Sequence, residues 1–143
     1  MSNVQITHST NHQGRTDVAV AVHPSAPQKL VTAAKHIPAM TSSQSHIDVH
    51  RSSDEGATWT LAKALLLPAG AAGAMSPSLA WDKAGNLFLA VAAWSSDKPG
   101  TGTGIHVYRS TDDGATWSEP KQVAVGKDFP SLAHDPRTGN VYL

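Results

Sequence analysis

The sequence predicts an all-β chain made of repeated units, and three observations carry this prediction. Residues 47–59 recur closely at 105–117, an offset of 58 positions (105 − 47). Short apolar runs are bounded by Pro, Gly, Asn and Asp, as at residues 18–22, 87–92 and 105–108, which is typical of strands and turns. No apolar pattern with a period of about 3.6 residues persists over the length of a helix.

Two further matches extend the repeat along the chain. Residues 77–82 and 85–89 recur at 130–135 and 139–143, and residues 17–33 hold a weaker copy of the same pattern. A period of about 50 to 60 residues is that of a four-stranded propeller blade with long loops. We therefore expect about four strands in each complete repeat.

The expected elements follow in chain order. In the first repeat the strands lie near residues 17–23, 29–36, 46–52 and 59–66. In the second they lie near 77–82, 86–94, 105–110 and 117–125. The third repeat begins with strands near 130–135 and 140–143, and Val4–Thr7 is a possible isolated outer strand. The predicted divisions are an N-terminal strand and loop over 1–16, a blade over 17–76, a second blade over 77–129 and the first half of a further blade over 130–143.

Composition excludes several classes of partner and site. The 143 residues carry 11 Lys+Arg and 11 Asp+Glu, so the formal net charge is zero and no basic run marks a nucleic-acid or anionic-membrane surface. The absence of cysteine excludes disulfides, thiolate metal sites and a cysteine nucleophile. Residues 61–75 are apolar but are broken by Lys, Pro and Gly and are too short for a membrane-spanning helix. The N-terminus shows no signal peptide.

An aspartate motif occurs at the same place in both repeats. The two copies are Ser52-x-Asp54-x-Gly56-x-Thr58-Trp59 and Ser110-x-Asp112-x-Gly114-x-Thr116-Trp117. In such a motif the carboxylate accepts hydrogen bonds from amides of its own turn, glycine supplies a positive φ, and the tryptophan folds onto the apolar layer. We interpret both aspartates as structural, because identical spacing in successive repeats is expected of a fold element, and we expect both tryptophans to be largely buried.

Both copies fit the Asp box, S-x-D-x-G-x-T-W, and the chain thereby resembles bacterial sialidases and related BNR-repeat proteins. The resemblance implies a sialidase-like β-propeller, usually six-bladed, of which about two and a half blades are present. We expect either the N-terminal part of a longer protein or several copies that assemble into a ring. The implied function is exo-α-sialidase-type glycoside hydrolysis, with this segment mainly structural. The alternative is a non-catalytic propeller that binds glycans or proteins. The family implies an extracellular or periplasmic location.

The resemblance also implies which residues to look for at a catalytic site. Sialidases clamp the substrate carboxylate with three arginines and use a tyrosine nucleophile, a supporting glutamate and an aspartate acid/base. Alignment of the innermost strands on Asp17, Pro77 and Pro130 places Arg15, Met75 and Asp128 at the position of the first arginine. Arg15 is therefore the candidate clamp residue, and this chain alone is expected to be inactive because the other catalytic residues come from later blades.

The histidines raise a metal hypothesis that we do not adopt at this stage. His46, Asp48 and His50 fall on one face of an expected strand, and His106 aligns with Asp48 in the next repeat. Asp97 lies in a segment that could hold calcium. The sequence thus predicts no metal and no cofactor. The expected partners are a glycan and either the remaining blades or further copies of the chain, with no nucleic acid and no membrane.

Overall fold

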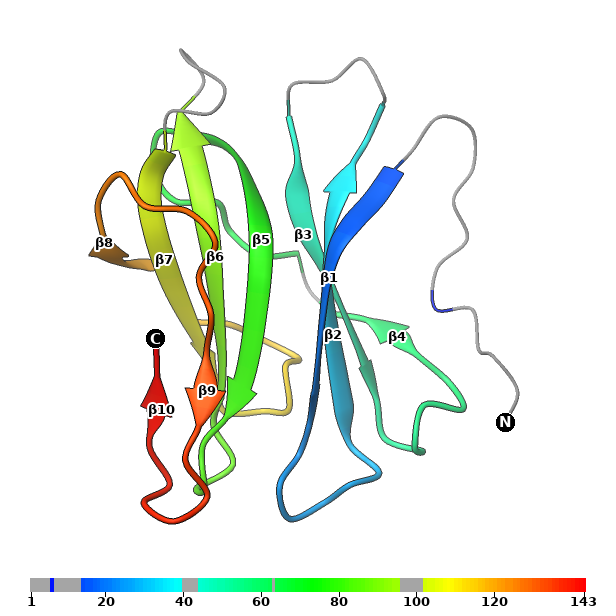
Figure 1. The fold of residues 1–143 in the computed structure, drawn as a ribbon. Coiled ribbons are helices and arrows are strands. Elements are labelled where there is room, and N and C mark those ends of the chain that lie inside the picture. The colour runs from blue at the N-terminus through cyan, green and yellow to red at the C-terminus, as the bar shows by residue number, and fades with distance from the viewer. Residues whose placement is uncertain (1–5, 7–13, 40–43, 63, 96–101) are drawn as a thin grey trace.

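The computed structural model describes residue 6 and residues 14–39, 44–62, 64–95 and 102–143. These residues form ten β-strands and no helix (Figure 1), so the all-β prediction is confirmed. Within these ranges no helix is long and apolar enough to cross a membrane. The expected outer strand at Val4–Thr7 and the calcium candidate Asp97 lie outside the described residues.

The first four strands form one antiparallel sheet, sheet 1, in the order β1-β2-β3-β4. Its strands are β1 (Gly14–Val22), β2 (Leu30–Ile37), β3 (His46–Ser52) and β4 (Thr60–Leu61). Each strand pairs with the next one along the chain, so the sheet is a simple meander. The fourth strand is much shorter than the expected range 59–66, because only His50 and Arg51 pair with it.

The next four strands repeat this arrangement in sheet 2, in the order β5-β6-β7-β8. Its strands are β5 (Ala71–Trp81), β6 (Leu87–Ser95), β7 (Gly102–Ser110) and β8 (Lys121–Ala124). β5 begins six residues before the expected start at residue 77, since four of the preceding residues also pair with β6: Ala71, Gly73, Ala74 and Met75. A short hairpin of β9 (Ala133–His134) and β10 (Val141–Tyr142) follows sheet 2.

The core lies between the two sheets, which stand side by side in Figure 1. β5 packs against β1, β2 and β3 across this interface. Sheet 1 contributes Val31, Ala33, Ile47 and Val49, whereas sheet 2 contributes a larger set: Ala74, Leu79, Trp81, Leu87, Leu89, Val91 and Tyr108. Ser45 also joins the sheets, because its Oγ donates to the Ala74 carbonyl at 2.7 Å.

Sheet 2 is buried on both faces, which explains the uninterrupted apolar sequence of β6. Ala90, Ala92 and Ile105 form a second cluster on the face turned toward the hairpin, with Leu132 packed against it. A strand covered on both sides reads as a continuous apolar run rather than as an alternating one. In sheet 1, by contrast, Val20 and Val22 of β1 are exposed while Ala19 and Ala21 pack against the core.

Candidate functional site

Three equivalent points of the chain adopt the same unusual backbone. Asp17, Ser76 and Phe129 have φ values of 51°, 52° and 53°, in the left-handed region that non-glycine residues rarely occupy. In β1 and β5 the register shifts at these points, between Thr16 and Ala19 and between Met75 and Ser78. Each shift is a β-bulge, a feature that re-aims side chains and is common beside functional sites.

The three points surround one cavity of about 300 Å³. Its lining consists of three successive pairs: Asp17-Val18, Ser76-Pro77 and Phe129-Pro130. Asp17 joins two of these pairs, because its Oδ2 accepts a hydrogen bond from the Ser76 amide at 3.3 Å. The cavity is thus built from the same position of three consecutive units and carries a carboxylate on its wall.

The bulges give a structural register for the segment that contains Arg15. The matching register shifts place Thr16 with Met75 and Asp17 with Ser76, one residue away from the alignment predicted from sequence. The sequence lacked this information, because the bulge shows only in the cross-strand pairing. In this register Arg15 lies one residue before the position that matches Met75, and its role as a substrate clamp stays a prediction.

Arg15 is held in an ion pair with Asp48 of β3. Its Nη2 and Nε donate to Asp48 Oδ2 at 2.8 and 3.2 Å, and its Nη1 is buried without a hydrogen-bond partner. The two side chains are 19% and 11% exposed, so this pair is largely withdrawn from solvent. Among the described residues, no arginine lines the cavity beside the bulges.

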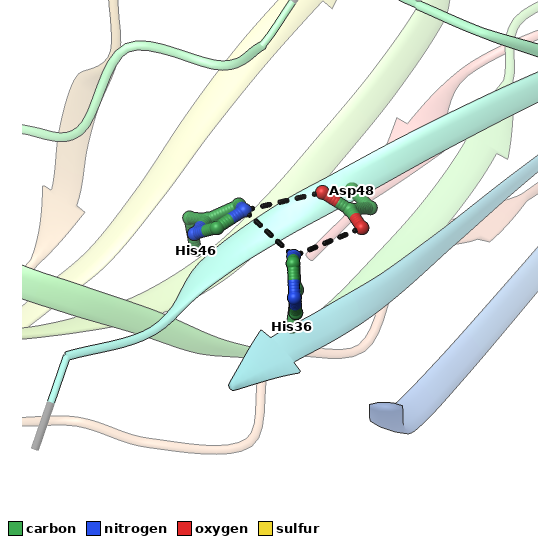
Figure 2. Close-up of side chains that lie close together, drawn as sticks. All are labelled: His36, His46 and Asp48. Atoms are coloured by element: carbon green, nitrogen blue, oxygen red, sulfur yellow. Dashed lines mark hydrogen bonds and ion pairs between the residues drawn. The ribbon is translucent and has the colours of Figure 1, made fainter. Parts of the chain in front are cut away.

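Asp48 also contacts two histidines on the same face of sheet 1. His36 of β2 and His46 of β3 are direct cross-strand partners, and Asp48 lies two residues further along β3. Figure 2 shows the three side chains pointing toward one another. His36 Nδ1 lies 2.9 Å from His46 Nε2 and 3.2 Å from Asp48 Oδ2, while His46 Nε2 lies 3.3 Å from Asp48 Oδ1.

The electrostatics of this cluster favour a neutral His36. Burial lowers the pKa of His36 below its ordinary value of 6.5, and the attraction of Asp48, which acts in the opposite direction, does not restore it. The Arg15 guanidinium adds to the lowering. The His36 ring therefore keeps a lone pair at neutral pH.

The other histidines of the metal hypothesis are not part of the cluster. His50 is buried on β3 opposite Thr32 and Leu61, and burial lowers its pKa. His106 is buried in sheet 2, where its Nδ1 contacts the Gly104 carbonyl at 3.3 Å. The sequence pointed to His46 and Asp48 but missed His36, which lies ten positions earlier and meets them only through the β2–β3 register.

The two aspartate turns have the same hydrogen bonds to their carboxylates. In the first, Thr58 donates to Asp54 from its amide at 2.9 Å and from its hydroxyl at 2.6 Å. In the second, Thr116 makes the same two bonds to Asp112 at the same distances. The residue before each turn glycine and the glycine itself have positive φ in both turns. These carboxylates are thus occupied within their own turns.

The hydrogen bonds acidify both carboxyls. Donation from the side chain and amide of Thr58, and then from Ser52, lowers the pKa of Asp54 from 3.8 to about 2. At Asp112 desolvation is the largest influence and raises the pKa, but the bonds from Thr116 and Ser110 together outweigh it and the net pKa is lowered. Both side chains are therefore ionised at neutral pH.

The tryptophans that end the two turns are only partly buried. Trp117 packs against the main core, while Trp59 donates from Nε1 to the Gly56 carbonyl at 2.9 Å. Two other tryptophans, Trp81 and Trp94, are the buried ones, at 3% and 7% exposure. Trp81 lies on β5 and Trp94 lies on β6. Both strands belong to sheet 2, which is covered on its two faces.

Comparisons with known proteins point to sialidases. No protein-family model matches the chain. A sialidase of Bacteroides fragilis (strain YCH46) is 34% identical over 111 residues, which are 62% of this chain and 20% of the sialidase. The chain thus spans about a fifth of the length of that curated relative.

Two solved structures share the fold. A protein of unknown function from Dyadobacter fermentans DSM 18053 has a TM-score of 0.67 at 19% identity, covering 95% of this chain and 47% of its own. The Hadza microbial sialidase Hz136 has a TM-score of 0.63 at 18% identity, covering 85% of this chain and 27% of its own. The chain is therefore all-β, similar in sequence to a sialidase over 111 residues and similar in fold to a sialidase domain.

Proposed function

We propose that this chain supplies two blades and the start of a third to a sialidase-like β-propeller that acts on glycans. The observation that carries the proposal is the cavity lined by three equivalent positive-φ points, two of which are β-bulges. In a propeller, successive four-stranded sheets surround one axis, and the same position of each innermost strand faces the centre. The packing of β1 on β5 and of β5 on β9 supports this arrangement.

The segment is mainly structural within the proposed propeller. The aspartate turns lie where β3 meets β4 and β7 meets β8, and each is satisfied by its own hydrogen bonds. Arg15 as the substrate clamp stays a prediction. A substrate carboxylate at Arg15 has to displace Asp48, which already accepts from two of its nitrogens.

Exo-sialidase chemistry requires groups that the cavity lining does not contain. A substrate carboxylate is held best by planar guanidinium forks, and the six lining residues in the described part of the chain include an aspartate but no arginine. This observation favours the second candidate, a non-catalytic propeller that binds glycans or proteins. For the catalytic function, the further arginines and the Tyr/Glu pair have to come from outside this sequence.

The test measures turnover and binding on the same purified chain. We expect no hydrolysis of a fluorogenic sialoside, together with NMR shift changes at the amides of Asp17, Ser76 and Phe129 when a sialoside is added. A neutral glycan that shifts the same amides more strongly favours the non-catalytic candidate. Turnover by the chain contradicts the mainly structural role, and an absence of shifts with every glycan contradicts the glycan-binding cavity.

A matched pair of variants locates the binding. Phe129 and Val125 are both highly exposed, at 79% and 75%, so neither substitution to alanine removes core packing. Only Phe129 lines the cavity. Phe129→Ala should weaken glycan binding while Val125→Ala leaves it unchanged, and equal affinities in the two variants place the glycan elsewhere.

A further inference from the structure

We propose that His36, His46 and Asp48 form a three-ligand site for a zinc-class divalent cation. The three ligand atoms all lie within 4.8 Å of one another and come from adjacent, hydrogen-bonded strands (Figure 2). The register of the two strands therefore brings the three ligand atoms together without requiring a loop to fold over the ion. The proposal concerns this cluster alone and does not depend on glycan binding.

The spacing of the ligand atoms fits a tetrahedral ion. Zinc bonds to imidazole nitrogen and carboxylate oxygen are about 2.0–2.2 Å long, so two ligand atoms of a tetrahedral site lie about 3.3 Å apart. Asp48 Oδ1, the oxygen that is available to the ion, already lies 3.3 Å from His46 Nε2, whereas the 3.2 Å contact of His36 Nδ1 is with the other oxygen, Oδ2. The two nitrogens are 2.9 Å apart and have to separate by only about 0.4 Å to reach that spacing.

The donor types select the metal. Two imidazole nitrogens and one carboxylate suit zinc and its transition-metal neighbours, whereas calcium and magnesium prefer shells made of oxygen. Ligation also requires imidazole nitrogens with free lone pairs. Calcium is therefore the expected non-binding control.

Arg15 acts on the site through Asp48 as a positioning residue. It holds Oδ2, which leaves Oδ1, on the His46 side, for the ion. Its positive charge also repels a cation, so we expect weaker binding than at a closed four-ligand structural site. The His46 side chain is 41% exposed, which gives water access to a fourth coordination position.

The direct test is calorimetric titration of the purified chain, first stripped with a chelator, with Zn²⁺ and with Ca²⁺. We expect one equivalent of Zn²⁺ to bind, no heat from Ca²⁺, and a Co²⁺ complex with the visible absorption of four-coordinate geometry. His36→Gln, His46→Gln and Asp48→Asn should each weaken Zn²⁺ binding by about tenfold or more. His134→Gln, which removes a histidine from β9, is the matched control and should keep the affinity.

A second measurement uses the unmodified chain, in case a substitution prevents folding. In NMR spectra of the imidazole nitrogens, Zn²⁺ should shift Nδ1 of His36 and Nε2 of His46 and leave the rings of His50 and His106 unchanged. Zn²⁺ should also raise the Tm, since an ion that binds only the folded chain stabilises it. The proposal is overturned if Zn²⁺ binding is undetectable. It is also overturned if His36→Gln and His46→Gln bind Zn²⁺ as strongly as the unmodified chain, or if Zn²⁺ shifts only the other histidines.

Discussion

At the scale of single residues, the buried serine that begins each aspartate turn, Ser52 or Ser110, stabilises the turn through its hydroxyl. Ser110 is 2% exposed, and its Oγ accepts from the Gly114 amide at 2.9 Å while donating to Asp112 at 2.8 Å. Ser52 makes the corresponding bonds in the first turn, to Gly56 and Asp54. Each serine thereby connects the end of a long strand to the carboxylate that organises the turn.

Removal of the Ser110 hydroxyl should destabilise the chain. Ser110→Ala leaves the buried Gly114 amide without its acceptor, and we expect a loss of about 1–3 kcal/mol in the free energy of unfolding. The neighbouring exposed residue Thr111 provides the control. Thr111→Ala should change the free energy of unfolding by no more than about 0.5 kcal/mol. Urea denaturation measures both variants, and equal losses would show that the Ser110 bonds do not hold the turn.

The acidified carboxyl of Asp54 predicts a pH dependence with a definite sign. Because the folded pKa of about 2 lies below the ordinary 3.8, this group stabilises the fold fully above about pH 4, and the stabilisation disappears as the pH falls through 2. Thr58→Val removes the largest cause and should raise the pKa of Asp54 toward 3.8. Thr60→Val, which changes an exposed residue of β4, is the control and should leave the pKa of Asp54 unchanged. Carboxyl ¹³C titration by NMR reads both, and an unmoved pKa in Thr58→Val contradicts the hydrogen-bond origin.

At the scale of elements, the two sheets share a plan but differ at the fourth strand, because two residues of β3 pair with β4 whereas three residues of β7 pair with β8. β8 pairs with β7 across a register shift between Ile105 and His106. Gly104 lies beside this irregularity with a φ of 124°, and a Cβ placed there would overlap the Ala124 carbonyl oxygen. The close approach of β7 and β8 therefore depends on a missing side chain.

Gly104→Ala should open the β7–β8 pairing. Gly70 is the matched control, because its φ of 78° imposes a similar backbone strain but an added Cβ meets nothing within 4 Å. We expect Gly104→Ala to destabilise the chain by at least about 1 kcal/mol more than Gly70→Ala. Hydrogen exchange of the Ala124 amide measures the local effect, and equal protection in the two variants would contradict it.

What the sequence could predict follows from how local each feature is. The turn motifs were readable because the hydrogen bonds to the two motif aspartates lie within eight consecutive residues, from Ser52 to Trp59 and again from Ser110 to Trp117. The bulge at Asp17 was not, because it exists only in the pairing of β1 with β2, and its omission shifted the alignment of Arg15 by one residue. The place of His36 beside His46 likewise required the strand register.

At the scale of the whole molecule, two apolar surfaces are open in the part of the chain that the structure describes. On the face of sheet 1 turned away from sheet 2, Val20 and Val22 are 61% and 50% exposed. A groove of about 660 Å³ lies between sheet 2 and the hairpin, with Phe88, Val107 and Leu132 among its lining residues. Open apolar sheet faces and unpaired strand edges are templates for association.

We therefore expect the isolated chain to associate through these surfaces. Light scattering at increasing concentration should show a mass above that of one 15.0 kDa chain. A single defined mass indicates a closed ring of copies, and a broad distribution indicates surfaces that other blades normally cover. A cooperatively unfolding monomer at high concentration would contradict the expectation that these surfaces require partners.

The central claim is that β1–β4, β5–β8 and the β9–β10 hairpin are successive units around one axis. A crystal structure of the chain tests it most directly. We predict that the rotation carrying sheet 1 onto sheet 2, about 60° if the complete ring has six blades, also carries β5 and β6 onto β9 and β10 and keeps Asp17, Ser76 and Phe129 around the axis. Sheets related by no common axis, or a hairpin that departs from it, would contradict the propeller and the function proposed from it.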